Sequence, residues 1–417
     1  MSGPGEPSPA LAIPYREAAV SPLRIAEASR GTWRTLWLFD RSTGGTDAAQ
    51  TFLNRIGTVV DITDLDGPDA AAKLADHEPT GITAFADDDI MRVAQIAQVL
   101  ALPYASLATA ERLTNKVAQR QALRAAGVSV PGFWSVDPRQ APHEVDALVA
   151  EARFPVIVKP QRGASSRDTV RADDAQALRA ALSVVDDAWI VEELLRDGWP
   201  RGSRPIADYV SVESFVSPTR TTHAAITGKT PLVDPFRETG SFVPADLSDE
   251  LSCQVLDVAT AAIAAMGDAV SAFHTEIKLT PDGPQVIEVN GRLCGGALPD
   301  VLGLACGVSA HRLACLTALG QDVHIIEPLA CDRVGYKWTL QHPMAARRLI
   351  NVQNLDQARQ LPGVQEIRLG RQVGDELDWR FGTQGGIFTV VGCADSHTAM
   401  IETLQAIERL VTVEYES

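Results

Sequence analysis

Two glutamates in a predicted β-hairpin are the side chains of this chain best placed to do chemistry. Residues 271–296 read SAFHTEIKLTPDGPQVIEVNGRLCGG, with apolar and polar residues alternating on both sides of the turn at 281–283. Centring the hairpin on Asp282 predicts these opposed pairs: Glu276–Glu288, His274–Asn290 and Leu279–Gln285. Directly opposed residues have Cβ atoms about 4.5–5.5 Å apart, so the two carboxylates would repel each other unless a cation lies between them.

Magnesium is the cation that best fits two such carboxylates. It prefers oxygen ligands and usually keeps one or two carboxylates together with substrate phosphates. The same spacing also fits an exposed hairpin in which Lys278 neutralises the glutamates. The opposite face carries the apolar residues expected in a core, namely Phe273, Ile277, Leu279, Ile287 and Val289.

A candidate phosphate-binding loop lies within residues 154–170. An apolar predicted strand ends at Lys159 and is followed by a loop that contains Gly163, Ser165 and Ser166. Backbone N–H groups in a small-residue loop can approach phosphate oxygens closely, and a lysine at its edge adds a point charge. The loop is not a Walker A sequence, and an ordinary surface turn has the same composition.

Taken in chain order, these motifs resemble the ATP-grasp superfamily of ligases. Within that superfamily they are similar to the carboxylate–amine ligases that include bacilysin-type L-amino acid ligases. The resemblance spans roughly residues 113–307. It rests on these segments: Asn115-Lys116, Lys159, the loop at 163–166, Glu192-Glu193-Leu194-Leu195, Ser211-Val212-Glu213, Arg237-Glu238-Thr239-Gly240, His274-Thr275-Glu276 and Glu288-Val289-Asn290-Gly291-Arg292.

The resemblance implies a site for ATP and for magnesium. Many relatives carry a glutamate where this chain has Tyr209, with Asp208 beside it, so the acid that holds the ribose is left open and Asp208 is a candidate. The residues implied at the nucleotide are Lys116, Lys159, Gly163, Ser165, Ser166, Glu192, Glu193, Leu195 and Asp208. Those implied at the metal are Glu276, Glu288 and Asn290, which are expected to hold two Mg²⁺ ions, with Mn²⁺ as a substitute.

The resemblance also implies substrate-binding and catalytic residues. Glu238 is the expected partner of a substrate ammonium, although relatives often have histidine where this chain has Ser241. Arg292 is expected to be catalytic together with Lys159, because a planar guanidinium suits a carboxylate or an acyl phosphate. The residues implied at the substrate are Glu213, Lys229, Glu238, Arg292, Gly295 and Gly296.

The reaction implied is ATP-dependent formation of an amide or peptide bond. A carboxylate, expected to belong to an amino acid, would attack the γ-phosphate, and an amine would then displace phosphate from the acyl phosphate, leaving ADP. Two alternatives stay open: an ATP-grasp carboxylase that uses bicarbonate, and a nucleotide-binding accessory protein without turnover.

Composition narrows the class of protein. The net charge of −16 in 417 residues argues against a nucleic-acid partner, which would need a basic face. Because no apolar run reaches eighteen residues and no basic leader opens the chain, we expect a soluble cytoplasmic protein with small-molecule substrates and no membrane partner. A homodimer is one assembly open to it. The six cysteines show no metal-binding spacing, so reduced thiols are expected.

Several units must position these residues, and the pattern predicts an α/β and α+β multidomain protein with an ATP-grasp fold. Strands and helices alternate after residue 33, which is typical of a parallel sheet covered by helices. The predicted units are a flexible leader at 1–30, a Rossmann-like domain at 31–112, a small nucleotide lobe at 113–195, a large lobe with the metal site at 196–330 and a C-terminal α+β domain at 331–417.

Overall fold

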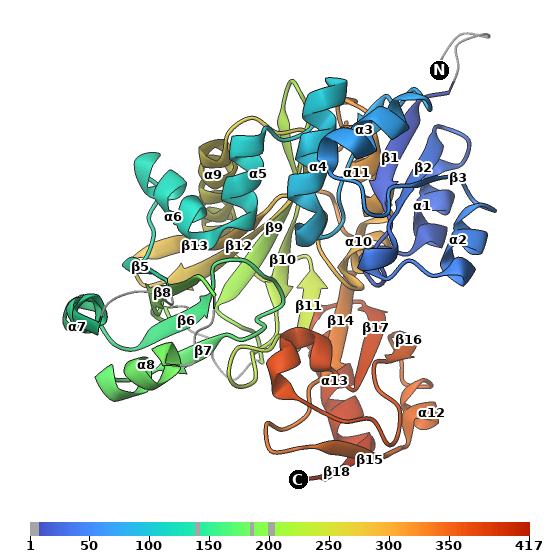
Figure 1. The fold of residues 1–417 in the computed structure, drawn as a ribbon. Helices are drawn as coiled ribbons and strands as arrows, with labels where there is room; N and C mark the ends of the chain where they lie inside the picture. The colour runs from blue at the N-terminus through green and yellow to red at the C-terminus, as the bar shows by residue number, and fades with distance from the viewer. Residues whose placement is uncertain (1–7, 138–141, 184–186, 199–204) are drawn as a thin grey trace.

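A computed structural model describes residues 8–137, 142–183, 187–198 and 205–417. Figure 1 shows three groups of elements, with the N-terminal sheet at one end, the small nucleotide lobe to one side and the C-terminal elements below. The long sheet in the middle carries the predicted hairpin and connects these groups. The predicted leading parallel sheet and C-terminal α+β region are confirmed.

The N-terminal unit is a parallel four-stranded sheet in the order β3-β2-β1-β4. Its strands are β1 (Ala10–Pro14), β2 (Arg34–Phe39), β3 (Thr58–Asp61) and β4 (Gly81–Ile82). Its helices are α1 (Pro22–Ser29), α2 (Asp47–Leu53), α3 (Gly67–Ala75) and α4 (Asp87–Leu100). Helix α4 contributes to the site because its first residue, Asp87, contacts Arg292, which follows strand β13 of the central sheet.

The prediction of a flexible leader over residues 1–30 is wrong from residue 10 onward. Strand β1 is an inner strand that pairs with β2 on one side and with β4 on the other, and Leu11 and Ile13 are fully buried. The apolar run at 10–13 is short and lies among Pro, Gly and Ser residues, so average composition concealed it. Residues 1–7 lie outside the part of the chain that the structure describes.

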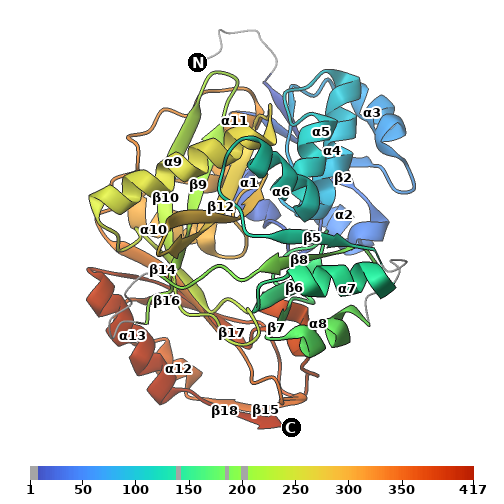
Figure 2. The same ribbon diagram turned by 90° about the vertical axis from the view of Figure 1, so that its left-hand side faces the viewer.

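The small lobe follows two helices, α5 (Leu107–Thr114) and α6 (Lys116–Ala125), and is an antiparallel sheet in the order β5-β8-β6-β7. Its strands are β5 (Phe133–Val136), β6 (Val156–Pro160), β7 (Val170–Ala172) and β8 (Trp189–Glu193). Helices α7 (Pro142–Glu151) and α8 (Ala175–Leu182) lie side by side against this sheet (Figure 2). The lobe therefore has its own small core, which includes Val156, Val158 and Leu178.

The central sheet has eight strands in the order β13-β12-β9-β10-β11-β14-β17-β16. The strands from the predicted large lobe are β9 (Tyr209–Val216), β10 (Thr221–Lys229), β11 (Gly240–Val243), β12 (Ser271–Thr280) and β13 (Gly283–Asn290). Those from the C-terminal region are β14 (Val334–Leu340), β16 (Val364–Leu369) and β17 (Phe388–Ala394). Since β11 pairs directly with β14, the sheet continues across the predicted boundary at residue 330.

Helices cover the central sheet, and a small ribbon completes the C-terminal region. The helices are α9 (Asp249–Met266), α10 (Leu298–Cys306), α11 (Ala310–Ala318), α12 (Leu355–Ala358) and α13 (His397–Leu410). The ribbon pairs β15 (Arg348–Gln353) with β18 (Thr412–Glu416). Among the residues that the structure describes, no single helix is long and apolar enough to cross a membrane, although the bent pair α10 and α11 passes that test by length and composition.

The predicted hairpin is formed by β12 and β13, and most of its register is confirmed. Glu276 lies opposite Glu288 and His274 lies opposite Asn290. The predicted pairing of Leu279 with Gln285 is wrong, because a bulge after Glu276 makes Leu279 pair with Pro284. The same extra residue moves Ile287 out of the core and puts Val286 there instead.

Two of the six cysteines are not the reduced thiols that the sequence predicted. Cys306, at the end of α10, forms a disulfide with Cys331 in the segment before β14. Cys253, Cys294, Cys315 and Cys393 are free. The two bonded residues are 25 positions apart in sequence, so only the folded chain brings them together.

Candidate active site

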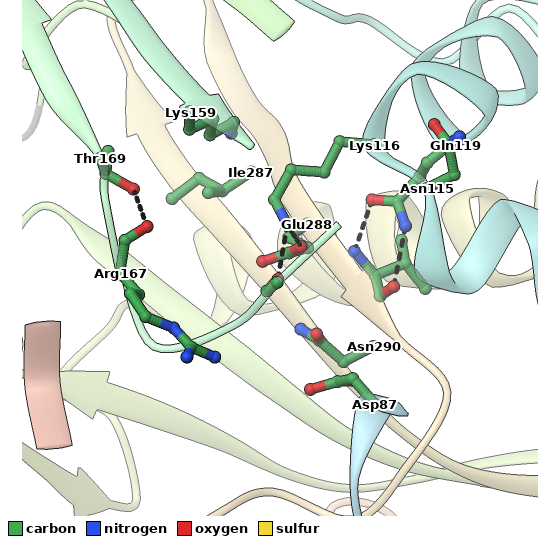
Figure 3. A network of polar contacts seen from close by, with 12 residues as sticks. Asp87, Asn115, Lys116, Gln119, Lys159, Arg167, Thr169, Ile287, Glu288 and Asn290 are labelled. Carbon is green, nitrogen blue, oxygen red and sulfur yellow. Dashed lines mark hydrogen bonds and ion pairs between the residues drawn. The ribbon is translucent and has the colours of Figure 1, made fainter. Parts of the chain in front are cut away.

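Lys116 connects the glycine loop to the hairpin. It is the first residue of α6, which begins there because the Asn115 side chain accepts hydrogen bonds from the backbone N–H groups of Val117 and Ala118. The Lys116 Nζ lies 2.9 Å from Glu288 Oε1 and donates to the Gly163 carbonyl at 2.8 Å (Figure 3). A cation thus already lies between the carboxylate predicted to bind metal and the loop predicted to cover phosphates.

Lys159 is held by a buried ion cluster at the end of β6. Its Nζ lies 2.6 Å from Glu192 Oε2, and Arg120 Nε donates to Glu192 Oε1 at 2.7 Å. Burial alone would raise the pKa of Glu192, but Arg120 and Lys159 outweigh burial and hold that pKa at about 2. Burial lowers the pKa of Lys159 more than the attraction of Glu192 raises it.

The sequence pointed to Glu192 as a nucleotide contact and missed Arg120. Both Glu192 oxygens are taken by cations and the residue is 3% exposed, so its side chain positions Lys159 and does not face open space. Arg120 lies four positions after Lys116 on α6, a spacing that puts both on one helix face. That spacing is the signal that could have found it.

The other predicted hinge residues have local partners. The backbone N–H of Glu193 donates to the Gly132 carbonyl, and its side chain accepts from the Gly132 N–H. Leu195 is half-buried just beyond β8. Roles for Glu193 and Leu195 at the nucleotide stay predictions.

The predicted metal ligands Glu276, Glu288 and Asn290 share one face of the hairpin. Glu276 and Glu288 are directly opposed. Asn290 lies two positions beyond Glu288 on the same strand (Figure 3). The pKa of Glu288 is lowered because Lys116 and Lys159 outweigh the effect of burial. These three side chains would bind a metal through their oxygen atoms, which suits Mg²⁺. Phosphate oxygens and water would complete the coordination shell of the ion. No set of three or more His, Cys, Asp and Glu side chains that could hold a metal occurs within the described residues.

The open alternative in which Lys278 neutralises the hairpin glutamates is wrong. Lys278 binds the carboxylates of Asp197 and Asp208, each at 2.7 Å. The lysine beside Glu288 is Lys116 instead. Asp208 is 2% exposed in this arrangement, and its predicted contact with a ribose stays a prediction.

The side chain of His274 orients the Glu276 carboxylate through a hydrogen bond. Its Nε2 lies 3.2 Å from Glu276 Oε1, and its Nδ1 lies 3.0 Å from both oxygens of Glu213. Burial lowers the pKa of His274, but Glu213 and Glu276 outweigh burial and raise it to about 9. His274 is therefore a hydrogen-bonding link between Glu213 and Glu276.

The predicted contact of Glu213 with substrate is not compatible with its position. Glu213 is 1% exposed, and its oxygens accept from Ser211, Thr227 and His274. Glu213 pairs with His274 on the same face of the sheet as Glu276 and Glu288, so its burial, and not its side of the sheet, keeps it from open space. Its contact with the described site runs through His274.

A second charged cluster surrounds Glu238, the predicted partner of a substrate ammonium. Lys229 Nζ lies 2.9 Å from Glu238 Oε1, and the Tyr209 hydroxyl donates to the same oxygen at 3.3 Å. Burial would raise the pKa of Glu238, but Lys229 and Lys337 outweigh it and hold the pKa at about 2. Lys337 comes from β14 in the C-terminal region, and no sequence motif indicated it.

Arg292 reaches across to the N-terminal unit. Its Nε and Nη2 donate to Asp87 Oδ2 at 2.9 and 2.6 Å. Gly295 and Gly296 follow, and a Cβ built on Gly296 would lie 3.6 Å from Lys337 Nζ. The structure thus brings Arg292 and Gly296 to the same region as Lys337, while Asp87, which was missed, fixes the guanidinium.

The glycine loop also contacts the C-terminal region. The Thr383 N–H donates to the Ser165 carbonyl at 3.0 Å, and the Thr383 hydroxyl accepts from the Glu238 N–H at 3.1 Å. One residue of the 3₁₀ segment Trp379–Gly385 therefore touches both the loop of Gly163, Ser165 and Ser166 and the segment of Glu238.

The lysine pair, the opposed carboxylates and the small-residue loop lie together, as the resemblance to ATP-grasp ligases predicts. The family model described as an ATP-grasp domain matches residues 113–296. Residues 113–296 of this chain are therefore an ATP-grasp domain.

Three relatives of this chain are informative, and two of them are named as ligases. The chain is 30% identical over 295 residues to the uncharacterized protein y4rH of Sinorhizobium fredii, which covers 69% of this chain and 58% of that protein. It is 27% identical over 262 residues to the alanine–anticapsin ligase of Bacillus subtilis, covering 58% of this chain and 54% of the relative. A D-alanine–D-alanine ligase of Streptomyces griseus is 30% identical over 179 residues, covering 38% and 41% of the two chains. These matches span less than two thirds of the relatives' own length.

Solved structures support the same fold over nearly the whole chain. An L-amino acid ligase from Bacillus licheniformis superposes with a TM-score of 0.79 at 19% identity, covering 99% of this chain and 100% of that one. A carboxyaminoimidazole ribonucleotide synthase from Aspergillus clavatus, solved with ATP, superposes with a TM-score of 0.71 at 16% identity, covering 97% and 99%. At these identities the likeness establishes the fold alone.

Proposed function

We propose that this protein is an ADP-forming ligase that joins a carboxylate, from an amino acid, to an amine through an acyl phosphate. The observation that carries the proposal is the position of Lys116 between Glu288 and the Gly163 carbonyl, close to the anchored Lys159. Phosphoryl transfer is mainly a problem of positioning and charge neutralisation, and two lysines beside a pair of opposed carboxylates meet both needs.

The nucleotide would replace contacts that the protein now makes with itself. Lys116 would exchange the Glu288 carboxylate and the Gly163 carbonyl for phosphate oxygens, which frees Glu288 for a metal. Magnesium bound by Glu276, Glu288 and Asn290 would neutralise charge on the phosphates. His274 would keep Glu276 turned toward that face.

The acid substrate would lie between Arg292 and Glu238. The guanidinium, fixed by Asp87, has donors suited to a carboxylate and to the acyl phosphate that replaces it. Glu238 offers a carboxylate for an α-ammonium, and Lys229 and Lys337 keep Glu238 ionised. The amine then attacks the acyl carbon, a C–N bond forms, the C–O bond to phosphate breaks, and one amine proton leaves to solvent.

Phosphate release tests the proposal directly. Pairs of amino acids are screened with ATP and Mg²⁺, and conjugates are detected by mass. We expect ADP, phosphate and an amide product. AMP with pyrophosphate would instead indicate an adenylating enzyme and refute the proposal.

Two comparisons separate the alternatives. Some structural neighbours are carboxyaminoimidazole ribonucleotide synthases, so the screen is repeated with labelled bicarbonate, whose incorporation into an amine would favour a carboxylase. Lys159→Met should abolish ATP turnover, whereas Lys73→Met, which changes an exposed lysine of α3, should not. Absence of turnover with every acid tested would favour an accessory nucleotide-binding protein.

A further inference from the structure

Thr383 forms hydrogen bonds with three separate segments of the chain. Its backbone N–H donates to the Ser165 carbonyl at 3.0 Å, and its hydroxyl accepts from the Glu238 N–H at 3.1 Å. Its own carbonyl accepts from Gln341 Nε2 at 3.0 Å. Ser165 lies in the loop predicted to cover the phosphates of ATP, and Glu238 is the predicted partner of a substrate ammonium. One residue of the C-terminal region therefore links the two predicted ligand sites.

The contact with the glycine loop is close. Gly382 has a φ of 63°, and a Cβ built on it would collide with the Ser165 carbonyl. Gln384 Nε2 donates to the Ser165 hydroxyl at 3.4 Å. Ser165 and Ser166 have φ values of 63° and 55°, a left-handed conformation that residues other than glycine keep only where the surrounding contacts hold it. Residues 382–384 supply such contacts, so they help to hold the loop in this form.

The contact with the substrate segment uses both backbone polar groups of Glu238. Its N–H donates to the Thr383 hydroxyl, and its carbonyl accepts from Gln341 Nε2 at 2.9 Å. Its carboxylate accepts from Lys229 Nζ and from the Tyr209 hydroxyl. Since the side chain and the backbone of Glu238 are both fixed, a ligand that restrains the carboxylate also restrains the N–H that meets Thr383.

ATP would act on the other end of the glycine loop. Lys116 Nζ now donates to the Gly163 carbonyl and would turn to the phosphates, as proposed above. The hydrogen bonds of Ser165 with Thr383 and Gln384 do not involve this lysine and would remain. The position of the loop over ATP would then depend more strongly on residues 382–384.

We propose that Thr383 is a positioning residue that couples binding of the acid substrate to closing of the glycine loop over ATP. The proposal rests on the proposed ligase function. An α-ammonium bound at Glu238 restrains Thr383 through the Glu238 N–H, and Thr383 in turn holds Ser165 over the phosphates. Because both ligands favour the same closed arrangement, each raises the affinity for the other by the same factor.

Nucleotide binding measures this coupling. The full chain with Mg²⁺ is titrated calorimetrically with the non-hydrolysable analogue AMP-PNP, alone and with each standard L-amino acid in excess. We expect at least one amino acid to lower the Kd of AMP-PNP about fivefold or more. Thr383→Val keeps the side-chain shape and the backbone N–H but removes the hydroxyl that accepts from Glu238, so the factor should fall below about twofold. Thr383→Ser should restore it.

A matched control and a second readout separate coupling from folding. Thr403→Val should keep the full coupling, because the Thr403 hydroxyl bonds to the Ala399 and Pro362 carbonyls within the C-terminal region. Melting temperatures check that the variants fold. Adding the amino acid to the AMP-PNP complex should also slow hydrogen exchange at residues 163–167 in the unaltered protein, and should not do so in Thr383→Val.

Two results would overturn the inference. One is full coupling in folded Thr383→Val, and the other is that no amino acid strengthens AMP-PNP binding by the unaltered protein. Gln341→Met, which removes the donor shared by Glu238 and Thr383, decides the question in the same way if Thr383→Val does not fold. Either result can accompany normal phosphate release in the amino acid screen, so the ligase function would stand.

Discussion

Replacing Glu192 with glutamine tests how much the buried ion cluster around Lys159 contributes to the free energy of unfolding. Glu192 compensates both Arg120 and Lys159 in a buried setting, so Glu192→Gln leaves two cations with a neutral partner. Removing one partner of a buried ion pair typically costs about 3–5 kcal/mol. The lowering of the Glu192 pKa from 4.5 to about 2 corresponds to about 3 kcal/mol by linkage. The two figures agree, and we expect a loss of about 3 kcal/mol at pH 7.

The loss of stability caused by Glu192→Gln should become smaller as the pH falls. Because the pKa of Glu192 is lower in the folded protein, its stabilisation is complete above the unfolded value of 4.5 and declines as the pH falls toward 2. The gap between the unaltered protein and Glu192→Gln should therefore narrow by about 1 kcal/mol at pH 3.5, one unit below the unfolded pKa. Denaturant unfolding at pH 7 and pH 3.5 measures both values.

A neighbouring acid and a neighbouring cation provide the controls. Glu193→Gln changes a residue that is more exposed and whose charged contact, with Arg153, is 3.9 Å long, so its effect should stay below about 1 kcal/mol. Lys159→Met keeps the pair of Glu192 and Arg120 and should cost turnover more than stability. If Glu192→Gln is as stable as Glu193→Gln at pH 7, the buried cluster is not what holds Lys159, and the reasoning fails.

Three further changes probe the metal, the substrate and the loop. Glu288→Gln should lower Mg²⁺-dependent phosphate release roughly 100-fold, since a metal ligand and the partner of Lys116 are lost together; near-normal turnover at saturating Mg²⁺ would contradict this. Arg292→Lys should lower kcat at least about tenfold with little change in melting temperature, because lysine keeps a charge beside Asp87 but loses the paired donors; unaltered kcat and KM would place Arg292 outside the reaction. Gly382→Ala should raise the KM for ATP, because its Cβ would collide with the Ser165 carbonyl in the glycine loop. Gly374→Ala, also at positive φ but in open space, should leave that KM unchanged.

The sequence by itself determined the local chemistry of the site. Alternating residues with a Pro-Asp-Gly turn predicted the hairpin and put Glu276 opposite Glu288, because a period of two leaves few alternative registers. Asn115 set the start of α6 and so the position of Lys116. The order of the motifs was enough to indicate the superfamily, since each motif lies in a local segment whose structure is set by its own residues.

Only the tertiary structure decided which charges meet. Arg120 joins Glu192, Asp87 joins Arg292 and Lys337 joins Glu238, and each partner comes from a different segment of the chain. The same holds for strand β1, whose place inside a sheet depends on partners on both sides. A long charged side chain can reach many neighbours from its backbone position. Which partner it binds is therefore decided by how elements that are far apart in the sequence pack together. A single sequence does not specify that packing.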